Sequence, residues 1–327
     1  MEKQRITYID LFRAAGIVSM IMGHINFGEP FDHLIHGFHM PLFFLVSGYF
    51  FKRSESTNSF KKKIRSKCKS LLLPYVIFAF FHIALASVLR KDFDYDWLRL
   101  LVFNTDKHGL PHAGALWFLT SLFFADIFYM TIDRICCYGK GMHCIVIAAG
   151  LIGNVLGLLP FRVPFGIDVS LVGMLFMHIG RLLRQDKTKK VLELNLISSL
   201  VLLVVGVSLI MINRYVNLRC GRYGIVPVFW TASIVTLIGL WNLCKIIDEL
   251  ANKANVCCYT YILNIGKDSI VYLCLNQLAI FASFKIVSHL NLSIWPARIC
   301  VLISVLILLE GARKLLTGTK LKALIGQ

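Results

Sequence analysis

Residues 8–27, YIDLFRAAGIVSMIMGHINF, form an apolar stretch of the length that crosses a membrane as one helix. Within it stand three ionisable side chains, Asp10, Arg13 and His24. Such groups are costly against lipid, so they usually face the interior of a helix bundle or a wet cavity. Asp10 and Arg13 also argue against a cleavable signal peptide, whose apolar core carries no charge. The stretch therefore predicts a retained first span with a polar face.

Arg13 and His24 are predicted to share one face of this span. They stand eleven residues apart, which brings them within about 20° of each other around a helix and separates them by roughly 16 Å along it. Asp10 precedes Arg13 by three residues, a spacing that allows an ion pair. A purely structural alternative pairs Asp10 with Arg13 at the membrane boundary and leaves His24 among the headgroups. The shared face favours a functional role for Arg13 and His24, and Asp10 fits either interpretation.

The composition predicts an all-α, polytopic transmembrane bundle that forms one domain over residues 1–327. Of these residues 57% are hydrophobic and 16% are charged, which is too little polar surface for a soluble chain of this length. A short second block and a turn between two prolines, Pro160 and Pro164, are the least regular parts of the pattern. The apolar residues fall into ten blocks, which we predict as spans at about 8–27, 37–51, 70–89, 114–132, 143–160, 164–182, 194–213, 225–246, 267–288 and 293–313.

The formal net charge of +17 comes largely from short basic loops. Lysine and arginine concentrate at 52–69, 184–190 and 314–322, which ten spans place on one side together with both termini. By the positive-inside rule that side is the cytoplasm, and we predict a multi-pass protein of a bacterial inner membrane. The outer loop RYVNLRCGRYG at 214–224 breaks the rule with three arginines, so it either holds an anionic ligand or is a solvated turn. No nucleic-acid-binding motif is found, so membrane lipids and not nucleic acid are the expected partners.

A histidine cluster follows the first span. His33, His36 and His39 have the three-residue spacing that places ligands on one helix face. No acidic or cysteine ligand accompanies them, a glycine and a proline interrupt the helix there, and none of the ten cysteines forms a CxxC pair. We therefore expect no metal site. Instead, His39 is expected to line the same cavity as His24, while His33 and His36 lie at the membrane interface.

Six motifs spread along the chain match a known pattern. They are Asp10-x-x-Arg13, Arg13-x10-His24, FHMPLFFLVSGYF at 38–50, LLLPY at 71–75, LWFLTSLFF at 116–124 and IGKDSIVYLCLNQ at 265–277. Together they resemble the integral-membrane acyltransferase-3 family, and above all its fucose 4-O-acetylase-like and polysaccharide O-acetyltransferase members. The last motif departs from the family pattern, because Asn276 stands where a histidine often follows the tyrosine. The role of that histidine is absent here or filled by Asn276 or Gln277.

The resemblance implies an O-acyltransferase that moves an acyl group, commonly acetyl, from cytoplasmic acetyl-CoA to a sugar hydroxyl of an envelope glycan or lipid-linked saccharide. Acyl-CoA is then a substrate, and no tightly bound cofactor is implied. An alcohol is a poor nucleophile, so His24 is the expected general base, or alternatively a transient acyl carrier. Arg13 is expected to bind the CoA phosphates or pantetheine carbonyls, or to stabilise the oxyanion.

The same resemblance suggests further site residues. Asp10, His39, Trp117 and Asn276 are expected to bind substrate. Lys61, Lys63 and Arg65, together with Arg13, are expected to attract the CoA phosphates, although topology alone explains this basic run equally well. Ser47 either makes a hydrogen bond in the cavity or, with the glycine that follows it, allows close helix approach.

Two other functions compete with acyl transfer. Ten helices with interior charges also suit an exporter of a glycan or lipid-linked sugar, but the sequence shows no inverted repeat and no matched pair of broken spans. A membrane scaffold without chemistry leaves the charged first span unexplained. Acyl transfer is therefore the prediction, and transport is the alternative.

Overall fold

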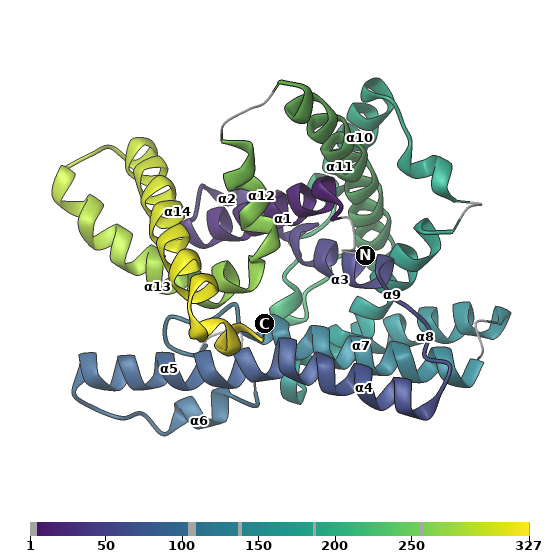
Figure 1. The fold of residues 1–327 in the computed structure, drawn as a ribbon, viewed down its shortest axis with the longest axis horizontal. Helices are drawn as coiled ribbons and strands as arrows, with labels where there is room; N and C mark the ends of the chain where they lie inside the picture. The colour runs from purple at the N-terminus through teal and green to yellow at the C-terminus, as the bar shows by residue number, and fades with distance from the viewer. Residues whose placement is uncertain (1–4, 104–108, 137–138, 186–187, 255–257, 327) are drawn as a thin grey trace.

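The computed structural model describes residues 5–103, 109–136, 139–185, 188–254 and 258–326, and over these ranges the chain is helical with no β-strand (Figure 1). The helices of five residues or more are α1 (Thr7–Ile25), α2 (Glu29–His36), α3 (His39–Tyr49), α4 (Thr57–Lys67), the π-helix Cys68–Leu72, α5 (Leu73–Arg90), α6 (Asp96–Leu100), α7 (Trp117–Cys136), α8 (Lys140–Gly157), α9 (Ile167–Leu183), α10 (Leu196–Ile212), α11 (Val226–Ala254), α12 (Tyr259–Lys267), α13 (Ser269–Val287), α14 (Ile294–Gly318) and the short 3₁₀ segment Lys320–Ile325.

Each of the ten predicted spans contains a helix, which confirms the all-α class. Five helices of the described chain are long and apolar enough to cross a membrane: Thr7–Ile25, Thr57–Arg90, Pro164–Leu183, Val226–Ala254 and Ser269–Leu290. Two more, Gly141–Gly157 and Leu196–Ile212, are apolar but shorter. The fold is that of a multi-pass helical membrane protein.

The second predicted span, 37–51, is only partly a helix. Its helix α3 begins at His39 and has eleven residues, which rise about 16 Å and are too few to cross the hydrocarbon core unaided. The helical structure is interrupted between α2 and α3 at Gly37 and Phe38, and Phe38 has backbone angles outside the helical region. Pro41 lies in the first turn of α3, where its missing N–H costs nothing. Pro41 is therefore compatible with a helix that begins at His39.

The charge pattern predicted a loop at 52–69, but most of this basic segment is helical. Residues 57–67 form α4, whose first turn is capped by the Ser56 hydroxyl accepting from the Ser59 backbone N–H at 3.1 Å. A π-helical turn then joins α4 to α5, so one helical rod runs from Thr57 to Arg90. Pro74 stands just after this turn. Because proline cannot continue a regular helix, the wider π turn lets the rod pass it without a break.

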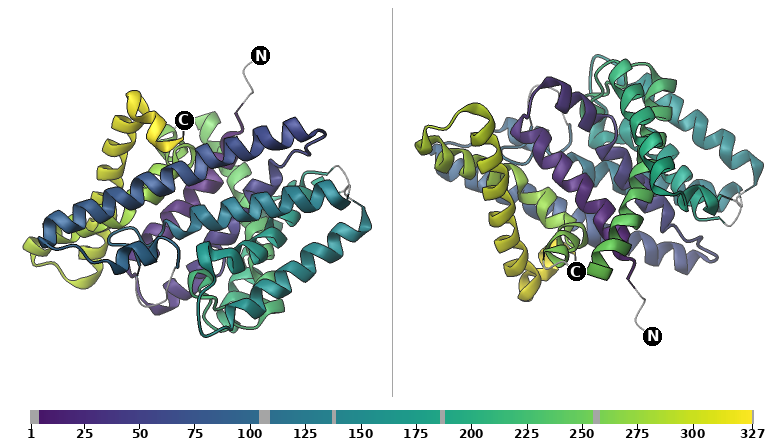
Figure 2. Two further views of the ribbon diagram at one scale, coloured as in Figure 1. Left: turned by 90° about the horizontal axis from the view of Figure 1, so that it is seen from below. Right: turned by 90° about the horizontal axis from the view of Figure 1, so that it is seen from above.

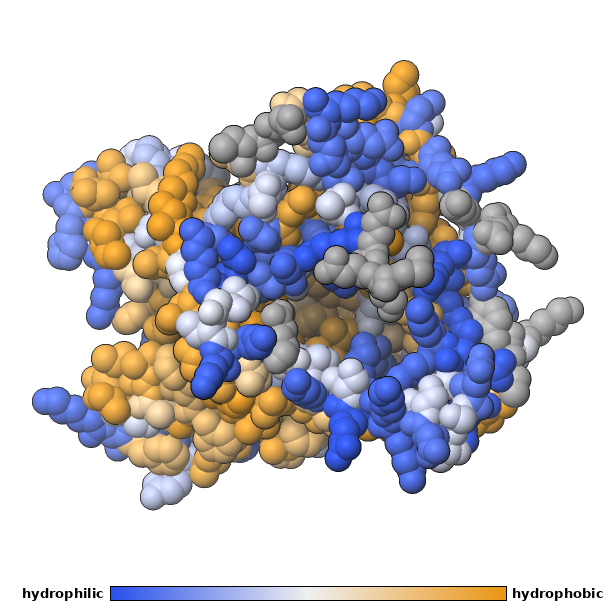
Figure 3. Space-filling view, viewed as in Figure 1, coloured by the Kyte–Doolittle hydropathy of each residue, from blue (hydrophilic) through white to orange (hydrophobic). Residues whose placement is uncertain are grey.

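Helix α1 lies inside the bundle and packs against α3, α11, α12 and α13 (Figure 2). The α13–α14 pair lies on one side of it and the α10–α11 pair on the other, while the rod of α4 and α5 runs beside α7. The first described residues and the C-terminal 3₁₀ segment emerge at the same face (Figure 2). Figure 3 shows hydrophilic residues gathered over much of the right half of the surface and a hollow near its centre with apolar residues at its base.

Candidate functional site

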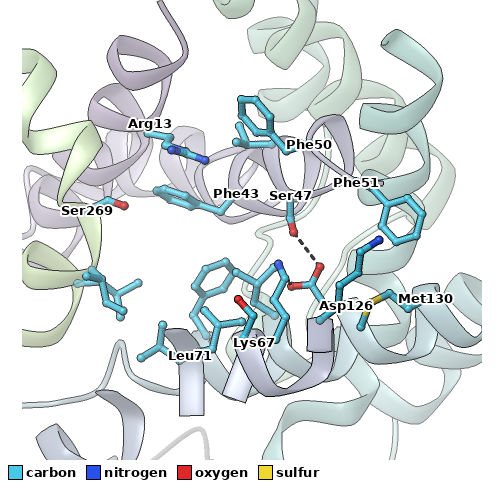
Figure 4. Close-up of a pocket in the computed structure, with 18 of the residues that line it drawn as sticks. Arg13, Phe43, Ser47, Phe50, Phe51, Lys67, Leu71, Asp126, Met130 and Ser269 are labelled. Atoms are coloured by element: carbon cyan, nitrogen blue, oxygen red, sulfur yellow. Dashed lines mark hydrogen bonds and ion pairs between the residues drawn. The ribbon is translucent and has the colours of Figure 1, made fainter. Parts of the chain in front are cut away.

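An inner cavity of about 550 Å³ opens beside the N-terminal half of α1 (Figure 4). Its polar lining includes Arg13 from α1, Ser47 from α3, Lys63 and Lys67 from α4 and Asp126 from α7, and phenylalanine rings form much of the remaining wall. The Arg13 guanidinium is 32% exposed, lies 5.7 Å from the Phe50 ring centroid and reaches Asp10 only at 3.8 Å. Its charge therefore faces the cavity, and among the described residues no carboxylate lies closer to it than that of Asp10.

A polar triad around the buried carboxylate of Asp126 forms one wall of this cavity. The Lys67 ammonium lies 2.6 Å from Oδ2 of Asp126, whose side chain is 3% exposed, and the Ser47 hydroxyl donates to Oδ1 of Asp126 at 2.9 Å. The triad joins α3, α4 and α7. Buried charges persist where they are paired, so the ion pair holds Lys67 toward the apolar interior of the cavity (Figure 4).

An outer cavity of about 230 Å³ lies beside the opposite end of α1. Its lining includes His24 from α1, His36 from α2, His39 from α3, Trp117 from α7 and Arg219 from the loop after α10. The His24 side chain is exposed, and the surface it exposes faces this cavity. Arg13 and His24 thus line different cavities from one helix.

Gln277 from α13 lies beside the His24 imidazole and faces its Nδ1 atom. The backbone N–H of Gly114 can only donate, and it lies 2.6 Å from Oε1 of Gln277. The other amide atom of Gln277 is therefore its NH₂ group, which faces Nδ1 of His24 at 3.5 Å. In the neutral imidazole Nδ1 then accepts and Nε2 carries the proton. The lone pair of His24 consequently lies on Nδ1, on the side of the ring that faces Gln277.

Helix α2 covers the outer cavity and is tied down by Asp32. Its carboxylate accepts from the Tyr215 hydroxyl at 2.6 Å and lies 3.2 Å from Nδ1 of His36. Burial alone raises the pKa of Asp32, but the hydrogen bonds from His36 and Tyr215 lower it more, so its pKa lies below the usual value. Burial and the Asp32 hydrogen bond raise the pKa of Tyr215. Asp32 is therefore an ionised tether between α2 and the outer loop.

Aromatic and aliphatic side chains separate the two cavities. Ile17, Phe43 and Phe118 line the inner cavity, whereas Met40 and Trp117 line the outer one. The Phe43 and Phe118 rings are 5.6 Å apart and both side chains are buried. Ile17 and His24 are two turns apart on α1, a rise of about 10 Å. A thin apolar barrier thus closes the space between them.

Several predicted site residues lie together and others do not. His24, His39 and Trp117 line the outer cavity, and Arg13 and Lys63 line the inner one. The remaining four belong to neither lining: Asp10, Lys61, Arg65 and Asn276.

Asp10 is 4% exposed and its carboxylate is held by Arg5, on the side where α1 contacts the backbone of Gly266. Asn276 is 1% exposed and donates to the carbonyl of Leu273 in its own helix at 2.6 Å. The next residue, Gln277, lies on a different side of α13 and faces His24. Asp10 and Asn276 therefore line neither of the two cavities, and their predicted contacts with substrate stay a prediction.

Lys61 and Arg65 are exposed on α4 and belong to neither cavity lining. Because α4 is a helix, only one of its faces meets the cavity, and Lys63 and Lys67 occupy that face. Lys63 also donates to the backbone carbonyl of Arg53 at 2.9 Å. The helical structure of α4 therefore determines which of its basic side chains line the cavity.

Lys67 and Asp126 were not predicted as site residues, and His36 lines the outer cavity although it was expected at the membrane interface. Gln277 was predicted only as an alternative to Asn276, and Arg219 only as part of the arginine-rich loop. Asp126 was the most visible of them, since a lone carboxylate in the middle of the apolar 116–132 run is unusual in a span. Lys67 belongs to a run of basic residues, and its position in that run does not distinguish it from the others. Ser47 and Gly48 serve both suggested purposes, because the serine bonds Asp126 and a side chain at Gly48 would overlap the Met177 carbonyl.

Comparison with known proteins identifies the family. A family model described as an acyltransferase domain matches residues 6–309, nearly the whole chain. No curated protein and no solved structure matches the chain. The match confirms the resemblance of the sequence motifs and agrees with the all-α, multi-pass fold. The chain therefore belongs to the integral-membrane acyltransferase-3 family and is a membrane acyltransferase.

Proposed function

We propose that this acyltransferase moves an acyl group, most simply acetyl, from cytoplasmic acyl-CoA to a hydroxyl of an envelope glycan or lipid-linked saccharide. One observation supports this above all: Arg13 and His24 project from one helix into two cavities at opposite ends of it. Each cavity has the concave shape and the few polar groups expected of a small-molecule site. The inner one suits the donor and the outer one suits the acceptor.

At the outer cavity, His24 is proposed to activate the acceptor hydroxyl through Nδ1. The hydroxyl gives its proton to Nδ1 as its oxygen attacks the thioester carbonyl, the C–O bond forms, the C–S bond breaks, and the proton passes on to the leaving thiolate. In the alternative route Nδ1 itself attacks the thioester carbonyl, and the C–S bond breaks to release the CoA thiolate. The hydroxyl then takes the acyl group from Nδ1, and its proton passes to the thiolate. Trp117 offers a flat apolar face of the kind on which sugar rings pack, and the NH₂ of Gln277 can donate to the hydroxyl oxygen.

At the inner cavity, Arg13 and Lys63 are proposed to hold the donor. The guanidinium of Arg13 faces the cavity beside the Phe50 ring and can donate to a phosphate or to an amide carbonyl of the pantetheine arm. The apolar wall between Ile17 and Phe118 accommodates the uncharged part of that arm. The barrier that these residues form must then open for the thioester to approach His24.

A cytoplasmic donor site requires a defined topology. We propose ten crossings with both termini in the cytoplasm of a bacterial inner membrane. The basic residues of α4, of the loop after α9 and of the C-terminal tail support this orientation through the positive-inside rule. The common face of the first described residues and the last segment agrees with it (Figure 2).

The proposal is tested by following label from [¹⁴C]acetyl-CoA into the glycan of isolated membranes. We expect His24→Ala to reduce transfer by roughly 100-fold or more, the contribution of a general base. His33→Ala is the matched control, because His33 lies on α2 outside the lining of the outer cavity. Equal transfer by wild type and His24→Ala at equal protein levels would exclude the proposal. Glycan movement across the membrane without any labelling would instead support an exporter.

A further inference from the structure

A second hollow of about 510 Å³ adjoins the mouth of the inner cavity. Phe51 and Lys52, in the turn after α3, line both hollows. The second hollow, which we call the basic groove, is otherwise lined by Arg53, Glu55, Arg181, Arg184 and Gln185. Four cations and one acid therefore surround a space of the size that small-molecule sites occupy, about 300–1,000 Å³.

Arg181, one of the arginines that line the basic groove, is held in place. Arg181 is 14% exposed, and its guanidinium lies 2.6 Å from a carboxylate oxygen of Asp133, which is 2% exposed. It also lies 4.8 Å from the centroid of the Phe51 ring and 5.9 Å from that of Tyr129. Basic residues that only set membrane topology need no such support. A fixed guanidinium is instead the usual means of recognising phosphate, which it binds through paired N–H groups.

The flanking arginines come from two different segments. Arg53 lies 3.9 Å from the second oxygen of Asp133, and Arg184 makes a long contact, 3.4 Å, with the Tyr49 carbonyl. Both side chains are well exposed toward the groove. The carboxylate of Asp133 is shared between two arginines, so the groove keeps a net positive charge. It offers several guanidinium groups to a ligand with more than one phosphate.

We infer that the basic groove binds the 3′-phosphorylated ADP part of the donor, while the inner cavity holds its acyl-bearing arm. This inference rests on the proposed function, in which the donor is acyl-CoA. The shared wall at Phe51 and Lys52 is where the diphosphate passes from one hollow to the other. The groove thereby distinguishes CoA thioesters from thioesters of the arm alone.

Binding measurements on the purified full-length protein in nanodiscs test this assignment without an acceptor. Dissociation constants are measured for CoA, for 3′-dephospho-CoA and for pantetheine, with wild type, Arg53→Ala and Arg184→Ala. We expect each substitution to weaken CoA binding roughly tenfold, the loss of one charge-assisted hydrogen bond. Pantetheine binding should stay unchanged. For at least one of the two variants the advantage of CoA over dephospho-CoA should disappear, because the arginine and the 3′-phosphate are partners.

Arg134→Ala is the matched control. Arg134 lies on the same side of the molecule, at the end of α7, and contacts Thr57 outside both hollows. CoA binding equal in wild type, Arg53→Ala and Arg184→Ala would overturn the groove assignment and leave the proposed function standing. An equal loss for CoA and pantetheine would also overturn it, because the effect would then be structural. Absence of CoA binding to the wild type would overturn the donor of the proposed function and the groove assignment together.

Discussion

At the scale of single residues, the tautomer of His24 decides which atom can act as a base. Gln277 is fixed at its Oε1 by the Gly114 N–H, so its NH₂ faces Nδ1 of His24. The 3.5 Å separation is long for a hydrogen bond. A hydroxyl that enters beside the two nitrogens can give its proton to Nδ1 and accept one from the amide. In the proposed function Gln277 therefore acts as a positioning residue for the acceptor and for His24.

Replacing Gln277 separates this role from simple packing. We expect both Gln277→Leu and Gln277→Glu to lower kcat about five- to tenfold, the value of one hydrogen bond, with the KM for acyl-CoA unchanged. Glutamate keeps an oxygen for the Gly114 N–H but cannot donate to Nδ1 when ionised. Steady-state kinetics of the two variants check this. Wild-type kcat in Gln277→Glu would show that only the Gly114 contact matters.

The sequence predicted the residues that one helix brings together, and missed those that the fold brings together. Arg13 and His24 stood out because helical periodicity alone places them on one face. Lys67 and Asp126 meet only because α4 lies beside α7, and no spacing along the chain encodes that contact. Asn276 was chosen over its neighbour because the rotation of α13 about its axis was unknown.

At the scale of helices, two glycines determine how closely α3 approaches α9. A Cβ at Gly48 on α3 would overlap the carbonyl of Met177, and a Cβ at Gly180 on α9 would overlap the carbonyl of Leu45. The two backbones are therefore in direct contact, as in many membrane helix pairs. This contact holds the short α3, and with it His39 and Ser47, between the two cavities.

Alanine at either glycine should destabilise the protein. We expect Gly48→Ala and Gly180→Ala each to cost about 1–3 kcal/mol, the usual penalty for overpacking, and to lower the melting temperature in detergent. Gly311→Ala is the control, since nothing lies within 4 Å of a Cβ at that position of α14. It should leave the melting temperature unchanged or raise it slightly, because alanine favours helix. Equal effects at Gly48, Gly180 and Gly311 would contradict the close packing of α3 on α9.

The helices themselves were largely predictable because apolar blocks report burial in lipid or protein directly. The exceptions are instructive. The segment 57–67 is too polar to be recognised as part of a span, yet it continues α5 through a π turn. The block at 37–51 is apolar but contains a helix of only eleven residues, because the backbone at Phe38 is not helical. Hydropathy identifies what is buried and says little about where a helix begins.

At the scale of the whole molecule, two cavities approach each other across a thin barrier. The inner one contains Arg13 and adjoins the basic groove, and the outer one contains His24 and lies beneath α2. The Phe43 and Phe118 rings lie between them. In the proposed function a donor from one side and an acceptor from the other meet near His24 without a hydrophilic passage through the membrane. This sidedness is the central claim of the proposed function.

Sealed membrane vesicles of known orientation test it most directly. [¹⁴C]acetyl-CoA is added outside inverted vesicles, whose cytoplasmic face is outermost, and outside right-side-out vesicles, with His24→Ala vesicles as the blank. We predict labelled ester only in the inverted vesicles, protected from an added esterase until detergent opens them. Labelling of right-side-out vesicles, or ester that the esterase removes from sealed inverted vesicles, would contradict transfer across the membrane.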